Sequence, residues 1–199
     1  MEPTGPKRRK PGERRIESLL GAAECVFAEL GYQRATTNHI AERAGASPGT
    51  LYQFFPNKKA IAEMLAARYA AELEAVLEKV LDRKQAHGPL HAVIGAVVDA
   101  MVRFQYRHPA FPAIFEAEFA STELGHTLRA RTVERLKSLM KERAPCLAAA
   151  RIEAAAEICT LAFHGVQPLL YSKNRAHSMR ISRELKLMLE RYLAPLVGE

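Results

Sequence analysis

The sequence predicts an all-α protein, and three observations support this fold class. Ala, Leu, Glu and Arg, all strong helix formers, dominate the composition. No run of alternating Val, Ile, Thr and aromatic residues indicates a sheet. Hydrophobic residues make up 48% of the 199 positions, which is enough for one large or two small domains to bury a core without disulfides.

The basic charge of the chain indicates an anionic partner. The formal net charge is +7, and residues 1–59 carry +4 of it, from ten Lys or Arg and six Glu. Nucleic acid and membrane surfaces are both anionic. No apolar run is long enough to span a membrane, and no apolar stretch follows the basic start as in a signal peptide. We therefore expect a cytoplasmic protein that does not bind the membrane.

Residues 1–12 are predicted to be a disordered basic arm. Residues 1–15 hold three Pro, two Gly and six basic side chains, and they cannot bury enough surface to fold alone. Two interpretations are open: a tail that keeps the protein soluble, or an arm that follows phosphates or enters a minor groove as homeodomain arms do.

The first helix is predicted to run from Glu13, where apolar residues begin to recur every three or four positions, to Gly31. A short second helix follows it. Thr36 or Thr37 can cap the N-terminus of this second helix, and Gly45 ends it.

The third helix begins at an apparent helix breaker, the dipeptide Pro48-Gly49. Ser47 is a favoured N-cap, and Pro48 then occupies the first helical position, where its missing N–H needs no partner. The helix lasts barely two turns, because Pro56 discourages its continuation. Two short helices joined by a Gly-containing turn form a helix-turn-helix. Helix stability does not explain Gly49, whereas close approach of another surface to its backbone would.

The rest of the chain also predicts helices. Asn57 can cap a fourth helix, whose first turn places Lys58 and Lys59 where the helix dipole disfavours cations and where a nearby phosphate would reverse that effect. Breaks at Gly and Pro divide this part of the chain into helices over roughly 58–86, 90–107, 111–119, 124–143, 149–172 and 178–196.

No catalytic signature appears in the sequence. It has no Gly-rich phosphate loop, no pair of His residues at metal-ligand spacing and no nucleophile elbow. Cys25, Cys146 and Cys159 are too widely spaced for a zinc site, and they are expected to be reduced cysteines in or near a core. We therefore expect no enzymatic activity, no metal and no cofactor.

The segment TTNHIAERAGASPGTLYQFFPNK, residues 36–58, resembles the helix-turn-helix of the tetracycline-repressor (TetR) family. The shared features are the Thr before the first short helix, IAERAG, GTLYQFF, and the Asn-Lys that opens the fourth helix. The resemblance covers roughly residues 13–65. It implies a homodimer of about nine helices per subunit, with a DNA-binding domain over 13–57 and a ligand-binding and dimerisation domain over 58–199.

The match to this motif implies nine contacts to double-stranded DNA: Thr37, Asn38, Ser47, Pro48, Gly49, Thr50, Tyr52, Gln53 and Lys58. Thr37, Tyr52 and Lys58 are implied as phosphate contacts. Asn38 is implied as a base reader, since Asn pairs well with adenine. Simple packing of Tyr52 and helix capping by Asn38 are the alternatives. The family often has His at the position of Phe54, so a polar phosphate contact is lost there.

Two further sets of residues are expected in the C-terminal domain. An apolar pocket for a small effector is predicted from Met101, Phe104, Phe111, Phe115, Phe119, His164 and Gln167, with ordinary core packing as the alternative. A dimer seam between the last two helices is predicted at Leu161, Gly165, Leu185, Leu189 and Tyr192.

The function expected from the resemblance is transcriptional regulation. The protein would be a repressor that binds a pseudo-palindromic operator as a homodimer and is released by a small, apolar effector. Two alternatives stay open at this point. One is a DNA-binding or architectural protein that responds to no ligand, and the other is an enzyme that uses the pocket of the helical domain.

Overall fold

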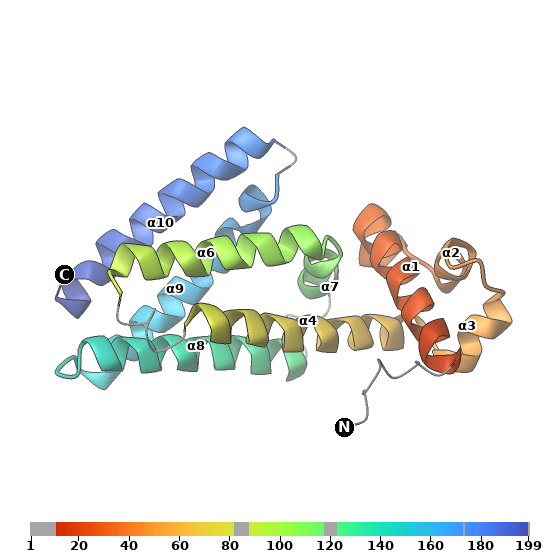
Figure 1. The fold of residues 1–199 in the computed structure, drawn as a ribbon, viewed down its shortest axis with the longest axis horizontal. Coiled ribbons are helices and arrows are strands. Elements are labelled where there is room, and N and C mark those ends of the chain that lie inside the picture. The colour runs from red at the N-terminus through yellow and green to blue at the C-terminus, as the bar shows by residue number, and fades with distance from the viewer. Residues whose placement is uncertain (1–10, 82–87, 118–122, 173, 199) are drawn as a thin grey trace, which may run out of the picture. The chain divides into compact units, whose positions relative to one another are not determined.

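The structure is a computed structural model that describes residues 11–81, 88–117, 123–172 and 174–198, and no side chain between residues 115 and 128. Nine helices and no strand occur in these ranges (Figure 1). They are α1 (Pro11–Arg34), α2 (Thr37–Arg43), α3 (Pro48–Phe54), α4 (Lys58–Val80), α6 (Leu90–Arg107), α7 (Phe111–Ala117), α8 (Glu123–Arg143), α9 (Ala149–Leu170) and α10 (Arg175–Val197). The predicted all-α fold is confirmed.

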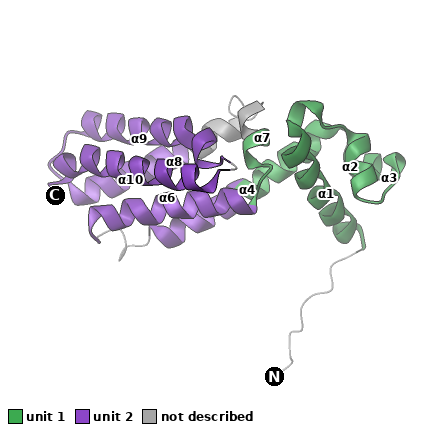
Figure 2. Ribbon diagram, turned by 90° about the horizontal axis from the view of Figure 1, so that it is seen from above, with its two compact units in different colours: residues 1–69, 108–119 green, residues 70–107, 120–199 purple. Residues whose placement is uncertain are grey.

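The chain forms two compact units, which are coloured separately in Figure 2. Unit 1 comprises Met1–Tyr69 and His108–Phe119, and unit 2 comprises Ala70–Arg107 and Ala120–Glu199. Helix α4 therefore contributes its first half to unit 1 and its second half to unit 2. Unit 1 includes more of the chain than residues 13–57, and the functional boundary that the resemblance implies after that segment stays a prediction.

Unit 1 folds around the apolar face of α1. Leu19, Ala23 and Phe27 are fully buried, and α1 packs against α2 and α7. Gly31 has a φ of 73°, a left-handed conformation that interrupts α1 where the sequence predicted its end, although one further turn follows. Gly45, which follows the C-cap Ala44 of α2, has a φ of 61°, and this confirms the predicted end of that helix.

Unit 2 is a bundle in which α8 packs on α9, α9 on α10, and α10 on α6. Its main core is built by α6, α9 and α10 and contains Leu90, Ile94, Val98, Cys159, Leu170, Leu185 and Leu189. Within the described ranges, no helix is both long enough and apolar enough to cross a bilayer. Helix α4 ends at Val80, earlier than predicted, and residues 82–87 lie outside the described part of the chain.

All three cysteines are free thiols, but they differ in exposure. Cys159 is buried, and its burial raises the pKa of the thiol to about 11, so this thiol stays protonated near neutral pH. Cys25 and Cys146 are exposed. The expectation that all three lie in or near a core is therefore wrong for these two residues.

Candidate nucleic-acid interface

Helix α2 begins with a capped turn that leaves its first side chains accessible. The Oγ1 atom of Thr36 accepts a hydrogen bond from the backbone N–H of His39 at 3.2 Å, so Thr36 is the N-cap and Thr37 is the first helical residue. Buried Ile40 determines which face of α2 points inward, and Asn38 is exposed. Because Thr36 is the cap, the alternative that Asn38 serves as a helix cap is wrong.

Helix α3 starts as the sequence predicts. The Oγ atom of Ser47 accepts a hydrogen bond from the N–H of Thr50 at 3.1 Å, and Pro48 occupies the first turn. Leu51 and, just after the helix, Phe55 are buried and anchor one face of α3 in unit 1. The exposed residues of this helix are Pro48, Gly49, Tyr52 and Gln53.

The hydroxyl groups of Thr37 and Tyr52 meet between α2 and α3. Their oxygen atoms are 3.0 Å apart, and either hydroxyl can donate to the other. Tyr52 is 52% exposed, so this large aromatic residue is not a core side chain. Each hydroxyl has one hydrogen and two lone pairs, and the pair therefore keeps one O–H that can donate to a phosphate oxygen.

The fold does not require glycine at position 49. A Cβ atom added to Gly49 would meet only the Oγ atom of Ser47, at an ordinary contact distance of 3.8 Å. Its φ is not positive, in contrast to the φ angles of Gly31 and Gly45. The protomer itself therefore gives no reason for a glycine here, and close approach of another surface to its backbone stays a prediction.

The ammonium group of Lys58 already has partners within unit 1. Its Nζ atom donates to the backbone oxygens of Tyr32 at 2.7 Å and Gln33 at 3.2 Å, and it lies 4.4 Å from the centroid of the Tyr32 ring. These oxygens belong to the last turn of α1, whose carbonyls have no helical N–H to follow. Lys58 thus joins the start of α4 to the end of α1, and one of its three N–H groups is left for a phosphate.

Sequence reasoning missed this internal role of Lys58, although a signal for it existed. The predicted break at Gly31 places carbonyl groups near the end of α1 that need donors from elsewhere in the chain. The predicted cap of α4 is confirmed, because the Oδ1 atom of Asn57 accepts a hydrogen bond from the N–H of Ala60 at 2.9 Å.

An ion pair holds α2 against α1. The two guanidinium nitrogens of Arg43 donate to the two carboxylate oxygens of Glu29, at 2.8 and 2.6 Å. The hydrogen bonds from Arg43 lower the pKa of Glu29, so this carboxylate is ionised near neutral pH. The fork geometry of such a pair restrains the orientation of α2 and, with it, the position of Thr37.

The residues predicted for an effector pocket do not share one environment. In unit 2, Phe104 and Gln167 are buried, Met101 is half-buried and His164 is exposed. Outside the described residues lie Phe119 and the side chain of Phe115. Of the residues predicted for the pocket, Phe104, Met101 and Gln167 are therefore the ones that are buried or half-buried in unit 2.

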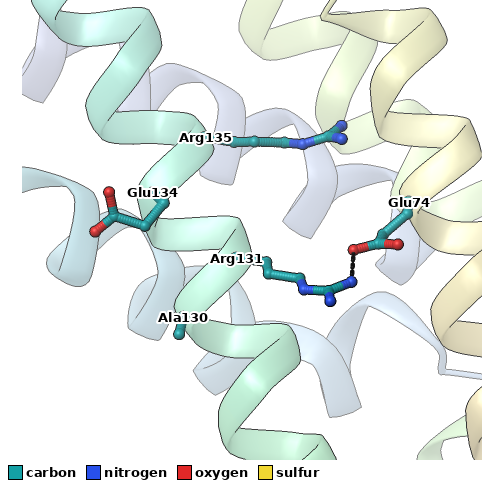
Figure 3. Close-up of a pocket in the computed structure, with 5 residues that line it drawn as sticks. All are labelled: Glu74, Ala130, Arg131, Glu134 and Arg135. Atoms are coloured by element: carbon teal, nitrogen blue, oxygen red, sulfur yellow. Dashed lines mark hydrogen bonds and ion pairs between the residues drawn. The ribbon is translucent and has the colours of Figure 1, made fainter.

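A surface pocket of about 460 Å³ lies between α4 and α8 in unit 2 (Figure 3). It is lined by Glu74, Ala130, Arg131, Glu134 and Arg135. Glu74 pairs with Arg131, and Glu78 pairs with Arg135 at 3.2 Å. The opposite charges around this pocket compensate one another, so it is not the apolar pocket that the sequence predicted.

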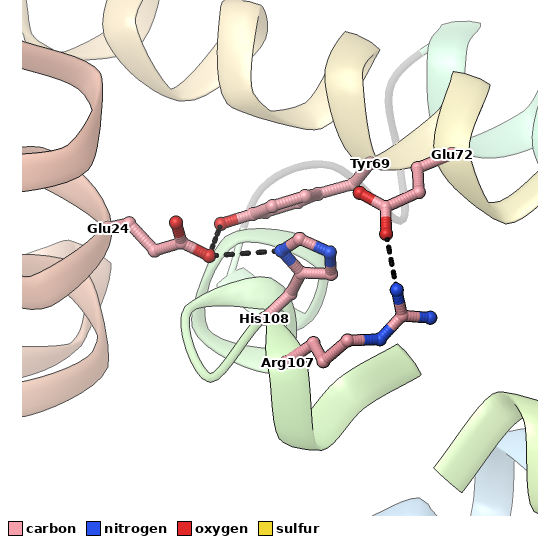
Figure 4. A network of polar contacts seen from close by, with 5 residues as sticks. All are labelled: Glu24, Tyr69, Glu72, Arg107 and His108. Atoms are coloured by element: carbon pink, nitrogen blue, oxygen red, sulfur yellow. Dashed lines mark hydrogen bonds and ion pairs between the residues drawn. The ribbon is translucent and has the colours of Figure 1, made fainter. Parts of the chain in front are cut away.

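In unit 1, Glu24 connects α1 to α4 and to the turn before α7 (Figure 4). Its Oε1 atom accepts a hydrogen bond from the Tyr69 hydroxyl at 2.8 Å and lies 3.2 Å from Nδ1 of His108. The ring of Phe111 lies 5.9 Å from that of Tyr69. Phe111 is thus buried in unit 1, whereas Phe104 is buried in unit 2, and their assignment to one pocket stays a prediction.

Exposed apolar residues of α9 lie on one face of that helix. Ile158, Leu161 and Leu169 are 50%, 54% and 46% exposed. Gly165 is also exposed, and a Cβ atom added there would meet no other atom within 4 Å. The spacing of three, four and four residues places all four on the same side of α9.

Two of the residues predicted for the dimer seam are not available at the surface. Leu185 and Leu189 are 3% and 8% exposed, because both belong to the core of unit 2, and Tyr192 packs against that core. The predicted seam is therefore revised: α9 offers exposed apolar surface, whereas these positions of α10 stabilise the protomer itself.

Two family models match the chain. Residues 19–65 match the model for bacterial regulatory proteins of the tetR family, and residues 89–193 match a tetracyclin repressor-like C-terminal domain. The second match alone covers more than half of the sequence. The chain belongs to the TetR family of DNA-binding transcriptional regulators. The resemblance noted in residues 36–58 is thereby confirmed.

Curated relatives match over short segments of the chain. The A-factor receptor protein of Streptomyces griseus is 42% identical over 48 residues, which are 24% of this chain and 17% of that protein. The HTH-type transcriptional activator FasR of Mycolicibacterium smegmatis is 46% identical over 50 residues, which are 25% of this chain and 23% of that protein. The chain thus spans about a fifth of the length of these curated relatives.

Solved TetR-family structures match nearly the whole fold. A transcriptional regulator from Streptomyces coelicolor has a TM-score of 0.68 at 22% identity, covering 92% of this chain and 99% of its own. A TetR-like regulator from Rhodococcus sp. RHA1 has a TM-score of 0.70 at 17% identity, covering 94% and 99%. At these identities the likeness is one of fold.

Proposed function

We propose that this TetR-family protein is a repressor that binds a pseudo-palindromic operator as a homodimer and is released by a small effector with an apolar body. The observation that carries the proposal is the pair of hydroxyls of Thr37 and Tyr52, 3.0 Å apart and exposed between α2 and α3. Beside it lies the open start of α3, where Gly49 keeps the surface free of a side chain.

In the proposed complex, α3 lies in the major groove and α2 crosses the backbone. The one O–H that the Thr37–Tyr52 pair keeps would donate to one phosphate, and Lys58 would reach a second phosphate with its remaining N–H. Asn38 and Gln53 are exposed and carry amide groups that can read base edges. The absence of a side chain at Gly49 would let the groove approach the backbone of α3.

The proposed dimer uses the exposed apolar face of α9. Ile158, Leu161 and Leu169 would be buried against the same face of a second copy, and Gly165 would permit close approach of the two helices. An isologous contact of this kind gives a two-fold axis, which explains why a pseudo-palindromic site is expected.

The proposed effector acts by changing the distance between the two α3 helices of the dimer. A molecule that binds unit 2 more tightly in one conformation shifts the population toward that conformation. If the two α3 helices then no longer match half-sites one helical turn apart, operator affinity falls. Since the protein would act on the chromosome, its proposed location is the cytoplasm.

The proposal is tested by selecting bound sequences from a random DNA pool with the full-length protein. Two inverted half-sites are expected among the selected sequences. Gel shifts on that site then compare Tyr52→Phe, which removes one hydroxyl of the Thr37–Tyr52 pair, with Tyr106→Phe, which removes the hydroxyl of an exposed tyrosine in unit 2, 3.5 Å from the hydroxyl of Ser178. Only Tyr52→Phe is expected to weaken binding, by about tenfold or more.

Failure to enrich any DNA sequence would overturn the proposal. A selected site bound equally well by both variants would remove the Thr37–Tyr52 pair as its basis. The sign of regulation is tested separately with a reporter gene behind the selected site, and higher expression in the presence of the protein would identify an activator.

A further inference from the structure

The core of unit 2 ends in a layer of polar side chains. Along α6, Gln105 lies seven residues beyond Val98, so it continues the helix face that packs in this core, and it is only 4% exposed. Along α9, Gln167 lies three residues before the core residue Leu170 and is 9% exposed. Two amide side chains therefore border an apolar core that α6, α9 and α10 build together.

Several donors in this polar layer have no acceptor. The Nε2 atoms of Gln105 and Gln167 and the hydroxyl of Tyr171 are buried, and none of them has a hydrogen-bond partner among the described residues. Tyr171 follows Gln167 by four residues, so the two share one side of α9. Burial, and to a lesser extent Tyr106, raise the pKa of Tyr171, so its hydroxyl keeps its hydrogen.

His164 lies three residues before Gln167 on α9. The residue as a whole is exposed, but partial desolvation of the ring and the charge of Arg129 lower the pKa of His164, whereas a hydrogen bond to Gln167 acts in the opposite direction. The Nε2 atom of Gln167 is the group that has no hydrogen-bond partner among the described residues.

Neighbouring hydroxyls in the same part of unit 2 are satisfied. Thr160 donates to the backbone oxygen of Ala156 at 2.8 Å, and Ser178 donates to the backbone oxygen of Leu170. The local fold thus provides acceptors for these two groups and none for the two amide nitrogens. The two amide nitrogens can only donate, so each of them needs an acceptor, whereas the Tyr171 hydroxyl can donate or accept.

We propose that this polar layer is the hydrogen-bonding end of the effector site, and that the effector is a neutral, largely apolar molecule whose carbonyl oxygen accepts from Gln105 or Gln167. The inference rests on the proposed function and names the chemistry of its effector. A carbonyl oxygen has two lone pairs and no hydrogen, which suits donors alone. The adjoining core favours an apolar body, and a buried ion would need a partner of opposite charge.

The first test measures the stability of the unliganded, full-length protein. Gln105→Met and Gln167→Met replace an unpaired amide by an apolar side chain of similar length. Each is expected to raise the melting temperature by about 2–5 °C, because an unsatisfied buried donor is removed. Gln53→Met, at an exposed glutamine of α3, is the matched control and is expected to leave the melting temperature unchanged.

A lower melting temperature in both buried variants would overturn the inference. It would show that an ordered water already satisfies the amides, since removing a satisfied donor costs stability. Unchanged melting temperatures would also overturn the inference, because they would show that the two buried amide groups do not destabilise the protein.

The second test compares two probes of nearly the same shape by calorimetric titration of the wild-type protein. Octan-2-one carries a carbonyl group, and 2-methyloct-1-ene has a methylene group in place of the oxygen. The ketone is expected to bind at least about tenfold more tightly. The double variant Gln105→Met/Gln167→Met is expected to lose this preference. Equal affinities, or no binding of the ketone, would overturn the inference.

Neither test contains DNA, so this inference and the proposed function fail independently. A protein that binds its selected operator but shows no preference for the ketone remains a regulator with a different effector chemistry. A protein that passes both tests but selects no DNA retains the carbonyl site and loses the assignment as a repressor.

Discussion

Lys58 shows how a single side chain can serve the fold and still suit a ligand. Its ammonium group supplies donors to two carbonyls at the end of α1, and it lies over the face of the Tyr32 ring. Positive charge at the start of α4 is disfavoured by the helix dipole, and these oxygens offset that cost within the protomer. A phosphate is therefore not needed to explain this lysine, although one N–H remains for it.

Replacing Lys58 by Met is expected to lower the free energy of unfolding by about 1–3 kcal/mol, because two carbonyls lose a charged donor. Lys59→Met is the matched control. Lys59 is exposed, and its recorded ion pair is with Glu63 at 3.9 Å, so a loss below about 0.5 kcal/mol is expected. Urea unfolding followed by circular dichroism measures both. Equal losses would contradict the structural role of Lys58.

A substitution at Gly49 is expected to have opposite effects on the stability of the protomer and on its binding to DNA. Gly49→Ala is expected to stabilise the protomer by up to about 1 kcal/mol, since alanine favours helix and the added Cβ meets no obstacle. The same variant is expected to weaken operator binding about tenfold. Gly21→Ala, in an exposed and open position of α1, is expected to stabilise the protein without affecting DNA.

Gel shifts and thermal melts on both glycine variants check this expectation. If Gly49→Ala and Gly21→Ala bind the selected operator equally well, the surface at Gly49 does not approach DNA.

At the scale of elements, the sequence predicted those helix starts and ends that depend on residues close together in the chain. Ser47, Thr36 and Asn57 cap helices through residues three positions further on, so the short segment contains the whole interaction. Gly31 and Gly45 mark helix ends for an equally local reason. The start and order of the helices of unit 1 could therefore be derived without knowledge of the tertiary structure.

Interactions between elements could not be predicted in this way. Lys58 finds its acceptors 26 and 25 residues away, and no pattern in the sequence specifies that distance. Leu185 and Leu189 carry the same helical spacing whether they face a core or a second subunit, so periodicity alone did not distinguish the two. The hydroxyl pair of Thr37 and Tyr52 was implied only as two separate contacts.

Helices α4 and α8 are joined by two ion pairs with matched spacing. Glu74 pairs with Arg131 and Glu78 with Arg135, so both partners recur after four residues. Arg135→Glu is expected to lower the free energy of unfolding by about 1 kcal/mol, because like charges then face each other. The exchange Glu78→Arg/Arg135→Glu is expected to restore most of it, as measured by a double-mutant cycle.

No recovery in the exchanged variant would show that the second of these pairs contributes through packing of the Arg135 stem and not through charge.

For the whole molecule, the decisive property is its oligomeric state. Leu161→Arg is expected to convert the proposed dimer to a monomer, because a charge would be buried at the centre of the α9 face. Met64→Arg is the matched control, since Met64 is an exposed apolar residue of α4 in unit 1. Sedimentation equilibrium measures the mass of each. A monomeric wild type, or an unaffected Leu161→Arg variant, would contradict the proposed seam.

Gly31, Gly45 and Gly49 should differ in how well evolution tolerates their substitution. Gly31 and Gly45 adopt positive φ, so every descendant that folds is under pressure to keep them, whatever it regulates. Gly49 meets no such demand from the backbone. In a lineage in which binding to the operator is no longer selected, Gly49 would be replaced before Gly31 and Gly45. In a mutant library selected only for protease resistance, substitutions at Gly49 should therefore accumulate while those at Gly31 and Gly45 disappear.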